Sequence, residues 1–164
     1  MTMTILTPNF LCSTLIFAIA AWIYVRPMLH THDLKTLLIP ILLLHMFRHL
    51  GLMFLERGAT LPGLASVFAI PAAYGDFLAA ILAFIALVGL LRNFRFSLLL
   101  VWIFNIEGTL DFLLAIALGT IYETGHFLGA AYWIPAFWVP ALLVTHFITF
   151  RLLLGRRNLA VTAA

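Results

Sequence analysis

The chain has 164 residues, of which 65% are hydrophobic and 9% charged, and its formal net charge is +3. A soluble domain carries about 25% charged residues, so this composition excludes a water-soluble fold and favours one domain, residues 1–164, in a bilayer. The nine Lys and Arg residues are scattered along the chain, which excludes the basic surface of a nucleic-acid-binding protein.

Five apolar runs follow one another, each near the about 20 residues that a membrane-spanning helix needs. They cover residues 6–25, 36–55, 68–91, 96–118 and 134–154. The runs are about twice as long as transmembrane strands and lack their alternation, which excludes a β-barrel. We therefore predict an all-α, polytopic integral membrane protein in the cell membrane, folded as a bundle of five transmembrane helices.

The basic residues predict the orientation of these helices. One side of the membrane would hold Arg26, Lys35, Arg92, Arg95, Arg156 and Arg157, whereas the other would hold only Arg57. Basic loops stay in the cytoplasm, so we expect the N-terminus out and the C-terminus in. We also expect no cleaved signal peptide, because no basic residue precedes the first run.

The second run contains polar residues where the bilayer core should be, in the stretch "HMFRHLGLMFLERG". Its His45, Arg48 and His49 are spaced i, i+3 and i+4, which on an α-helix places them on one face. Arg48 lies about two turns from the end of the run, too deep to reach the interface by snorkelling. We therefore expect it to have a partner inside the protein.

Candidate partners occur in the three following runs. Asp76 lies in "PAAYGDFLAA" of the third run, and Glu107 and Asp111 lie at i and i+4 in "FNIEGTLDFLL" of the fourth. His146 lies near the middle of the fifth run. In the predicted orientation these residues reach overlapping depths, so we predict one polar layer that opens to the outer face.

The formal charge of this layer is unbalanced. Arg48 supplies one positive charge against three negative charges, and each ionised group costs about 3 kcal/mol when isolated at the bilayer centre. The excess must be offset by protons on carboxylates, by histidinium, by a bound cation or by water in a cavity. Such dependence on an exchangeable species indicates a functional site.

The first functional hypothesis is a site that binds a metal ion or a small lipophilic or anionic ligand, with acid/base or metal-assisted chemistry as one option. Residues with acid/base character are Asp76, Glu107 and Asp111. The ligand-binding candidates are Arg48, His49, Asp76 and Asp111. The metal-binding candidates are His45, His49 and His146, since a helical i, i+4 His pair presents both imidazoles to a metal.

Three alternatives stay open. The layer could line the pathway of a proton-linked transporter, channel or ligand sensor. Two of His45, His49, His126 and His146 could ligate haem in an electron carrier. Arg48 paired with Asp76 or Asp111 could instead be a structural clamp. Rows of small residues such as Gly75-Ala79-Ala83 fit helix contacts within one protomer or between protomers of a homo-oligomer.

Overall fold

The structure, a computed structural model, describes residues 6–29 and 31–161, with side chains as far as residue 155. The described part of the chain is helical and contains no β-strand, only an isolated bridge between Arg57 and Thr60. Five of its helices are long and apolar enough to cross a membrane. The predicted all-α class and the five long helices are therefore confirmed.

Three of the five long helices combine shorter elements that follow one another along the chain, and two are single α-helices. The first comprises α1 (Leu6–Ala20), the π-helical turn η1 (Ala21–Val25) and α2 (Arg26–Met28). The second comprises α3 (Leu34–Met46) and the 3₁₀ helix η2 (Phe47–Leu55). The third and fourth are α4 (Ser66–Leu91) and α5 (Ser97–Ile121). The short turns η3 (Thr124–His126) and η4 (Gly129–Tyr132) lead to the π-helical η5 (Ile134–Trp138) and α6 (Val139–Val161).

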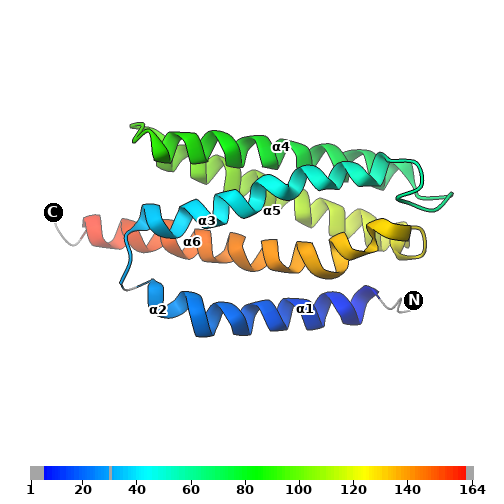
Figure 1. The fold of residues 1–164 in the computed structure, drawn as a ribbon, viewed down its shortest axis with the longest axis horizontal. Helices are drawn as coiled ribbons and strands as arrows, with labels where there is room; N and C mark the ends of the chain where they lie inside the picture. Colours follow the sequence, from blue (N-terminus) through cyan, green and yellow to red (C-terminus); the bar gives the residue numbers. More distant parts are fainter. Residues whose placement is uncertain (1–5, 30, 162–164) are drawn as a thin grey trace.

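The helices run side by side as an elongated bundle (Figure 1). α4 packs against α5, α3 and η2, whereas α1 packs mainly against α6 and η5 at the edge of the bundle. No residue of α1, η1 or α2 is buried. The protein interior is therefore made by the second to fifth long helices.

Small residues let α4 approach its neighbours closely. Ala73, Ala79, Ala83 and Ala86 are each 0% exposed. A row of small side chains allows helix backbones to come close together, which favours association of apolar helices in lipid. α4 is thus positioned to bring its one buried acid, Asp76, against the helices that surround it.

Two apolar clusters fill the interior. One includes Phe54, Phe112 and Leu142, and the other includes Leu42 and Phe104. The ring of Phe112 lies against Arg48, and the ring of Phe104 lies against His45 and His146. The buried polar residues therefore lie between two apolar layers.

Candidate functional site

Arg48 faces the interior from a segment in which the second long helix changes its winding. The α-helix ends at Met46 and continues as a 3₁₀ helix, in which residues three apart are aligned. The buried residues accordingly recur every third position, as His45, Arg48, Gly51 and Phe54. Arg48 is 1% exposed, so its guanidinium lies wholly inside the protein.

Two aspartates from different helices bind this guanidinium. Nε of Arg48 donates to Oδ1 of Asp76 at 2.7 Å, and its Nη2 donates to Oδ2 of Asp111 at 2.6 Å. Both aspartates are buried. These short charge-assisted hydrogen bonds are of the strong kind, and they join η2 to α4 and α5.

The remaining nitrogen of the guanidinium reaches α5 and α6. Nη1 donates to the carbonyl oxygen of Gly108 at 3.2 Å and lies 3.2 Å from Nε2 of His146. The guanidinium carbon also lies 3.8 Å from the centre of the Phe112 ring, where a cation is favoured by the electrons of the ring. We call Arg48, Asp76, Asp111, Asn105 and His146 the Arg48 cluster.

Three glycines leave the space that the cluster occupies. A Cβ at Gly51 would overlap the carboxylate of Asp76, and a Cβ at Gly75 would overlap that of Asp111. At Gly108 an added Cβ would lie 2.7 Å from Cε1 of His146, closer than packed atoms approach. The charged groups are therefore packed directly against backbone, without side chains between them.

Asn105 fixes the tautomer of His146. The Nδ2 amide of Asn105 donates to the carbonyl oxygen of His146 at 3.3 Å, which turns its Oδ1 to Nδ1 of the same residue at 2.7 Å. An amide oxygen only accepts hydrogen bonds, so Nδ1 carries the proton. Nε2 then accepts from Arg48, and His146 is neutral.

His45 has the opposite tautomer. Its Nε2 lies 2.9 Å from Oγ1 of Thr145, and that hydroxyl donates its proton to the carbonyl oxygen of Leu142 at 2.9 Å. The hydroxyl must therefore accept from Nε2–H of His45. Nδ1 of His45 is buried and has no partner among the described residues. A proton there would lack an acceptor, so His45 is neutral too.

Glu107 lies one helical turn before Asp111 on α5. Its side chain is partly buried, and its Oε2 atom is buried without a hydrogen-bond partner among the described residues. Among the described contacts, Arg48 donates to Asp76 and Asp111 and not to Glu107.

The structure brings together most of the polar layer expected from the sequence, but not His49. Arg48, Asp76, Asp111 and His146 are in contact, and the ring centroids of His45 and His146 are 4.3 Å apart. His49 is exposed, and its Nδ1 lies 2.9 Å from the carbonyl oxygen of Met46. The prediction that His45, Arg48 and His49 share one face assumed an α-helix. In the 3₁₀ helix that forms instead, His49 points outward.

Sequence reasoning left two members of this site unassigned. Asn105 was not predicted as a site residue, but it joins α5 to α6 through the imidazole that contacts Arg48. Thr145, the partner of His45, was not singled out. Its position immediately before His146 was the available signal, since a hydroxyl beside a buried His can satisfy a second ring.

The structure does not gather the predicted metal-binding residues His45, His49 and His146 into one set of ligands. Among the described residues, no group of three His, Cys, Asp or Glu side chains is placed to hold a metal ion. His49 points away from His45, and His126 lies in the turn η3. The Nε2 atoms of His45 and His146 are both engaged in hydrogen bonds within the protein.

A protein-family model described as "Domain of unknown function (DUF8737)" matches residues 5–154, and the chain belongs to this family. The match covers all five long helices as far as residue 154, including the whole Arg48 cluster. No curated protein and no solved structure matches the chain.

Proposed function

We propose that the chain is an integral membrane protein whose Arg48 cluster, together with Glu107, takes up and releases a proton, in the manner of a proton-linked transporter or sensor. The observation that carries the proposal is the arrangement of one guanidinium between two aspartates, with a partly buried third carboxylate, Glu107, whose Oε2 atom has no hydrogen-bond partner among the described residues.

The surface of the bundle supports a membrane location. Large apolar side chains are exposed along all five long helices, for example Leu15, Phe84, Leu110 and Phe147. Burying them in lipid removes them from water, as in other bundles that satisfy their backbone hydrogen bonds internally. The basic residues Arg26, Lys35, Arg92 and Arg95 support the orientation with the N-terminus outside.

The hydrogen bonds of His45 and His146 restrict how the negative charge of the three carboxylates can be balanced. With His45 and His146 neutral, Arg48 contributes +1, and Asp76, Asp111 and Glu107 contribute −3 when ionised, which leaves −2. Histidinium cannot supply the difference in this arrangement. A proton on a carboxyl group reduces the excess from −2 to −1, and Glu107 is the acid whose oxygen has no donor among the described residues.

The same geometry argues against an anionic ligand. Arg48 already donates to both aspartates, so an anion would have to displace a carboxylate and add to an existing negative excess. Protons, by contrast, reduce that excess.

Arg48 lies nearer along its helix to Leu55 than to Leu34, and in the proposed orientation this favours proton exchange with the outer face.

Infrared spectroscopy of the purified protein tests proton binding. We expect a carbonyl band from a protonated carboxyl group that disappears as the pH is raised, and we expect Glu107→Gln to abolish it. Glu56→Gln is the matched control, because Glu56 is exposed in the loop after η2 and its replacement removes the same charge. A spectrum without a titrating carboxyl band, or one unchanged by Glu107→Gln, would contradict the proposal.

Transport is tested with the same variants in liposomes containing a pH-sensitive dye. Wild-type protein and Glu56→Gln should dissipate an imposed pH gradient faster than empty liposomes, whereas Glu107→Gln should not. If the infrared band titrates but no protein moves protons, the sensor form of the proposal is the one that stands. Proton flux that persists in Glu107→Gln would exclude Glu107 as the proton carrier.

Orientation is tested by cysteine labelling in a Cys12→Ser background. Thr31→Cys lies in the loop before α3, and Arg57→Cys lies in the loop after η2; both residues are exposed. An impermeant maleimide applied to intact cells should label Arg57→Cys and spare Thr31→Cys. The reverse pattern would overturn the proposed orientation.

A further inference from the structure

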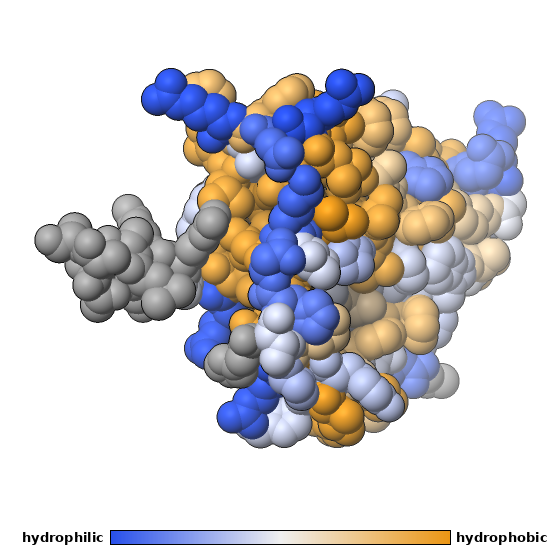
Figure 2. Space-filling model, turned by 60° about the vertical axis from the view of Figure 1, so that its left-hand side comes forward, coloured by the Kyte–Doolittle hydropathy of each residue, from blue (hydrophilic) through white to orange (hydrophobic). Residues whose placement is uncertain are grey.

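An open depression lies at the basic end of the bundle, far from the Arg48 cluster. It has a volume of about 380 Å³ and lies between the start of α3 and the turn that joins α4 to α5. Its polar lining comes from Asp33, Lys35, Asn93, Arg95 and Ser97. Figure 2 shows hydrophilic residues gathered over this end of the molecule, with hydrophobic side chains beside them.

The cations of this depression have no carboxylate partner among the described residues, where only Arg48 forms ion pairs. Lys35 donates from Nζ to Oδ1 of Asn93 at 3.0 Å, a neutral acceptor that leaves its charge uncompensated. The one acid, Asp33, instead accepts from the backbone N–H of Thr36 at 3.1 Å as the N-cap of α3. The depression is therefore electropositive.

The depression is also bordered by apolar surface. Leu34, Leu90 and Leu98 complete its lining. Next to it along the chain, Phe94 and Phe96 are 52% and 62% exposed. A ligand that fits this site therefore has an anionic group on one side and an apolar portion on the other.

We propose that the depression binds the headgroup of an anionic phospholipid. Lys35 and Arg95 contact the phosphate, the Ser97 hydroxyl donates to a phosphate oxygen, and the acyl chains lie along Leu98 and Phe96. Cations near a membrane surface attract anionic lipids, and each cation raises the binding constant by about fivefold. This inference rests on the membrane location in the proposed function, but not on proton binding.

Lipid counting by native mass spectrometry tests the site. Purified protein is incubated with phosphatidylglycerol or with phosphatidylcholine, which share the phosphate but differ in net charge. We expect preferential retention of phosphatidylglycerol, and roughly thirtyfold weaker retention in the double variant Lys35→Gln/Arg95→Gln, since two cations are lost. Arg26→Gln/Arg57→Gln is the matched control, because it removes two exposed cations outside the depression.

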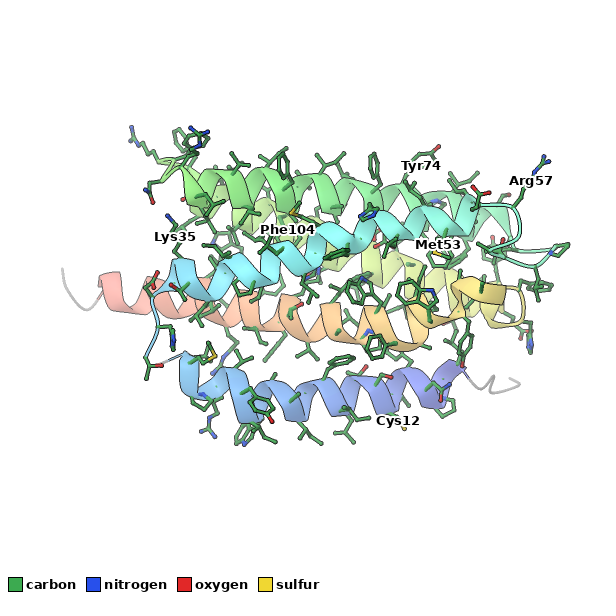
Figure 3. The ribbon with its side chains drawn as sticks, viewed as in Figure 1. Cys12, Lys35, Met53, Arg57, Tyr74 and Phe104 are labelled. Atoms are coloured by element: carbon green, nitrogen blue, oxygen red, sulfur yellow. The ribbon has the colours of Figure 1, made fainter. Side chains whose placement is uncertain are left out.

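The two control residues lie outside the depression, so their replacement changes the net charge without changing the proposed site. Lys35 and Arg57 lie at opposite ends of the bundle (Figure 3), and Arg26 lies at the end of the first long helix, over Trp22. The control double variant should retain phosphatidylglycerol as wild type does. Equal weakening in both double variants would mean that net charge alone attracts the lipid, which would overturn the proposed site.

Competition with inorganic phosphate separates a lipid site from a site for free phosphate. We expect phosphate to displace phosphatidylglycerol poorly, since it lacks the apolar portion. Displacement at equal concentrations, or equal retention of phosphatidylcholine, would overturn the lipid assignment. Alkaline carbonate extraction distinguishes the two proposals: release from membranes would refute the membrane location and the lipid site together, whereas embedded protein without lipid selectivity would refute the lipid site alone.

Discussion

The carboxylate of Asp111 occupies the space that a side chain at position 75 would fill. A Cβ built on Gly75 overlaps Oδ1 of Asp111 and lies 3.2 Å from its Oδ2. Asp111 can therefore reach Arg48 only because α4 presents a glycine at this point. The ion pair and the helix packing at this position are one structural feature.

Gly75→Ala should consequently destabilise the protein, because the methyl group would push Asp111 away from Arg48. Overpacking of this kind costs about 1–3 kcal/mol. Gly155→Ala is the control, since its Cβ would meet no atom within 4 Å and lies in a helix. That variant should be neutral or more stable by up to about 1 kcal/mol. Thermal unfolding in detergent compares them, and equal midpoints would contradict the packing described for Gly75.

Arg48→Leu should be among the most damaging substitutions. Removing one member of a buried ion pair leaves uncompensated charge and costs about 3–5 kcal/mol. The triple variant Arg48→Leu/Asp76→Asn/Asp111→Asn should recover much of this loss, because it removes the stranded charges as well. Exposed Arg57→Leu should change stability by less than about 0.5 kcal/mol. If Arg48→Leu unfolds at the same temperature as Arg57→Leu, the ion pairs do not stabilise the fold.

The two buried histidines should show opposite tautomers by nitrogen-15 NMR of the ring nitrogens. We expect the proton of His146 on Nδ1 and that of His45 on Nε2, as their partners Asn105 and Thr145 require. Asn105→Leu should leave Nδ1–H of His146 without its acceptor and lower stability by about 1–3 kcal/mol. An unfolding midpoint equal to that of wild type would contradict the role given to Asn105, and finding the same tautomer on both rings would contradict the assignment.

Asp33 gives the start of α3 a pH dependence. Hydrogen bonds from the side chain and then the backbone of Thr36 lower the pKa of Asp33 below its ordinary value of 3.8. A group whose pKa is lowered in the folded state stabilises the fold above about pH 4. This stabilisation is lost as the pH falls through the lowered pKa. Asp33→Ala should therefore lower the unfolding temperature at neutral pH, with the gap closing in acid. Thermal unfolding across pH measures the gap; a gap that widens in acid would contradict the sign.

The five long helices were predictable because length and apolarity are local properties of the chain. The fourth was expected at 96–118 and is found at Ser97–Ile121. Its end was missed because Gly119 and Thr120 look like a loop, although Thr120 continues the helix and donates its hydroxyl to the carbonyl oxygen of Ile116. Composition thus predicts the elements, while their ends depend on single hydrogen bonds.

The facing of the side chains was only partly predictable. Arg48 and the aspartates meet as expected, since an arginine this deep needs anions and few are present. His49 was misplaced because its direction depends on whether the helix after Met46 is α or 3₁₀. Nothing in the letters "FRHLGLMFL" specifies that winding. In the structure, Gly51 of this segment packs against Asp76 of α4, a contact that the local sequence does not reveal.

The 3₁₀ winding of η2 also links length to rotation. Nine residues at about 2.0 Å each span about 18 Å, whereas an α-helix of the same nine would span about 13.5 Å. Rewinding to an α-helix would also turn each successive residue by about 20° relative to the last, so that Leu55 would rotate by about half a turn. Rotation of η2 at Leu55 is therefore coupled to a change in its length: rewinding to an α-helix would shorten the segment and move the loop that carries Glu56 and Arg57 toward the middle of the bundle.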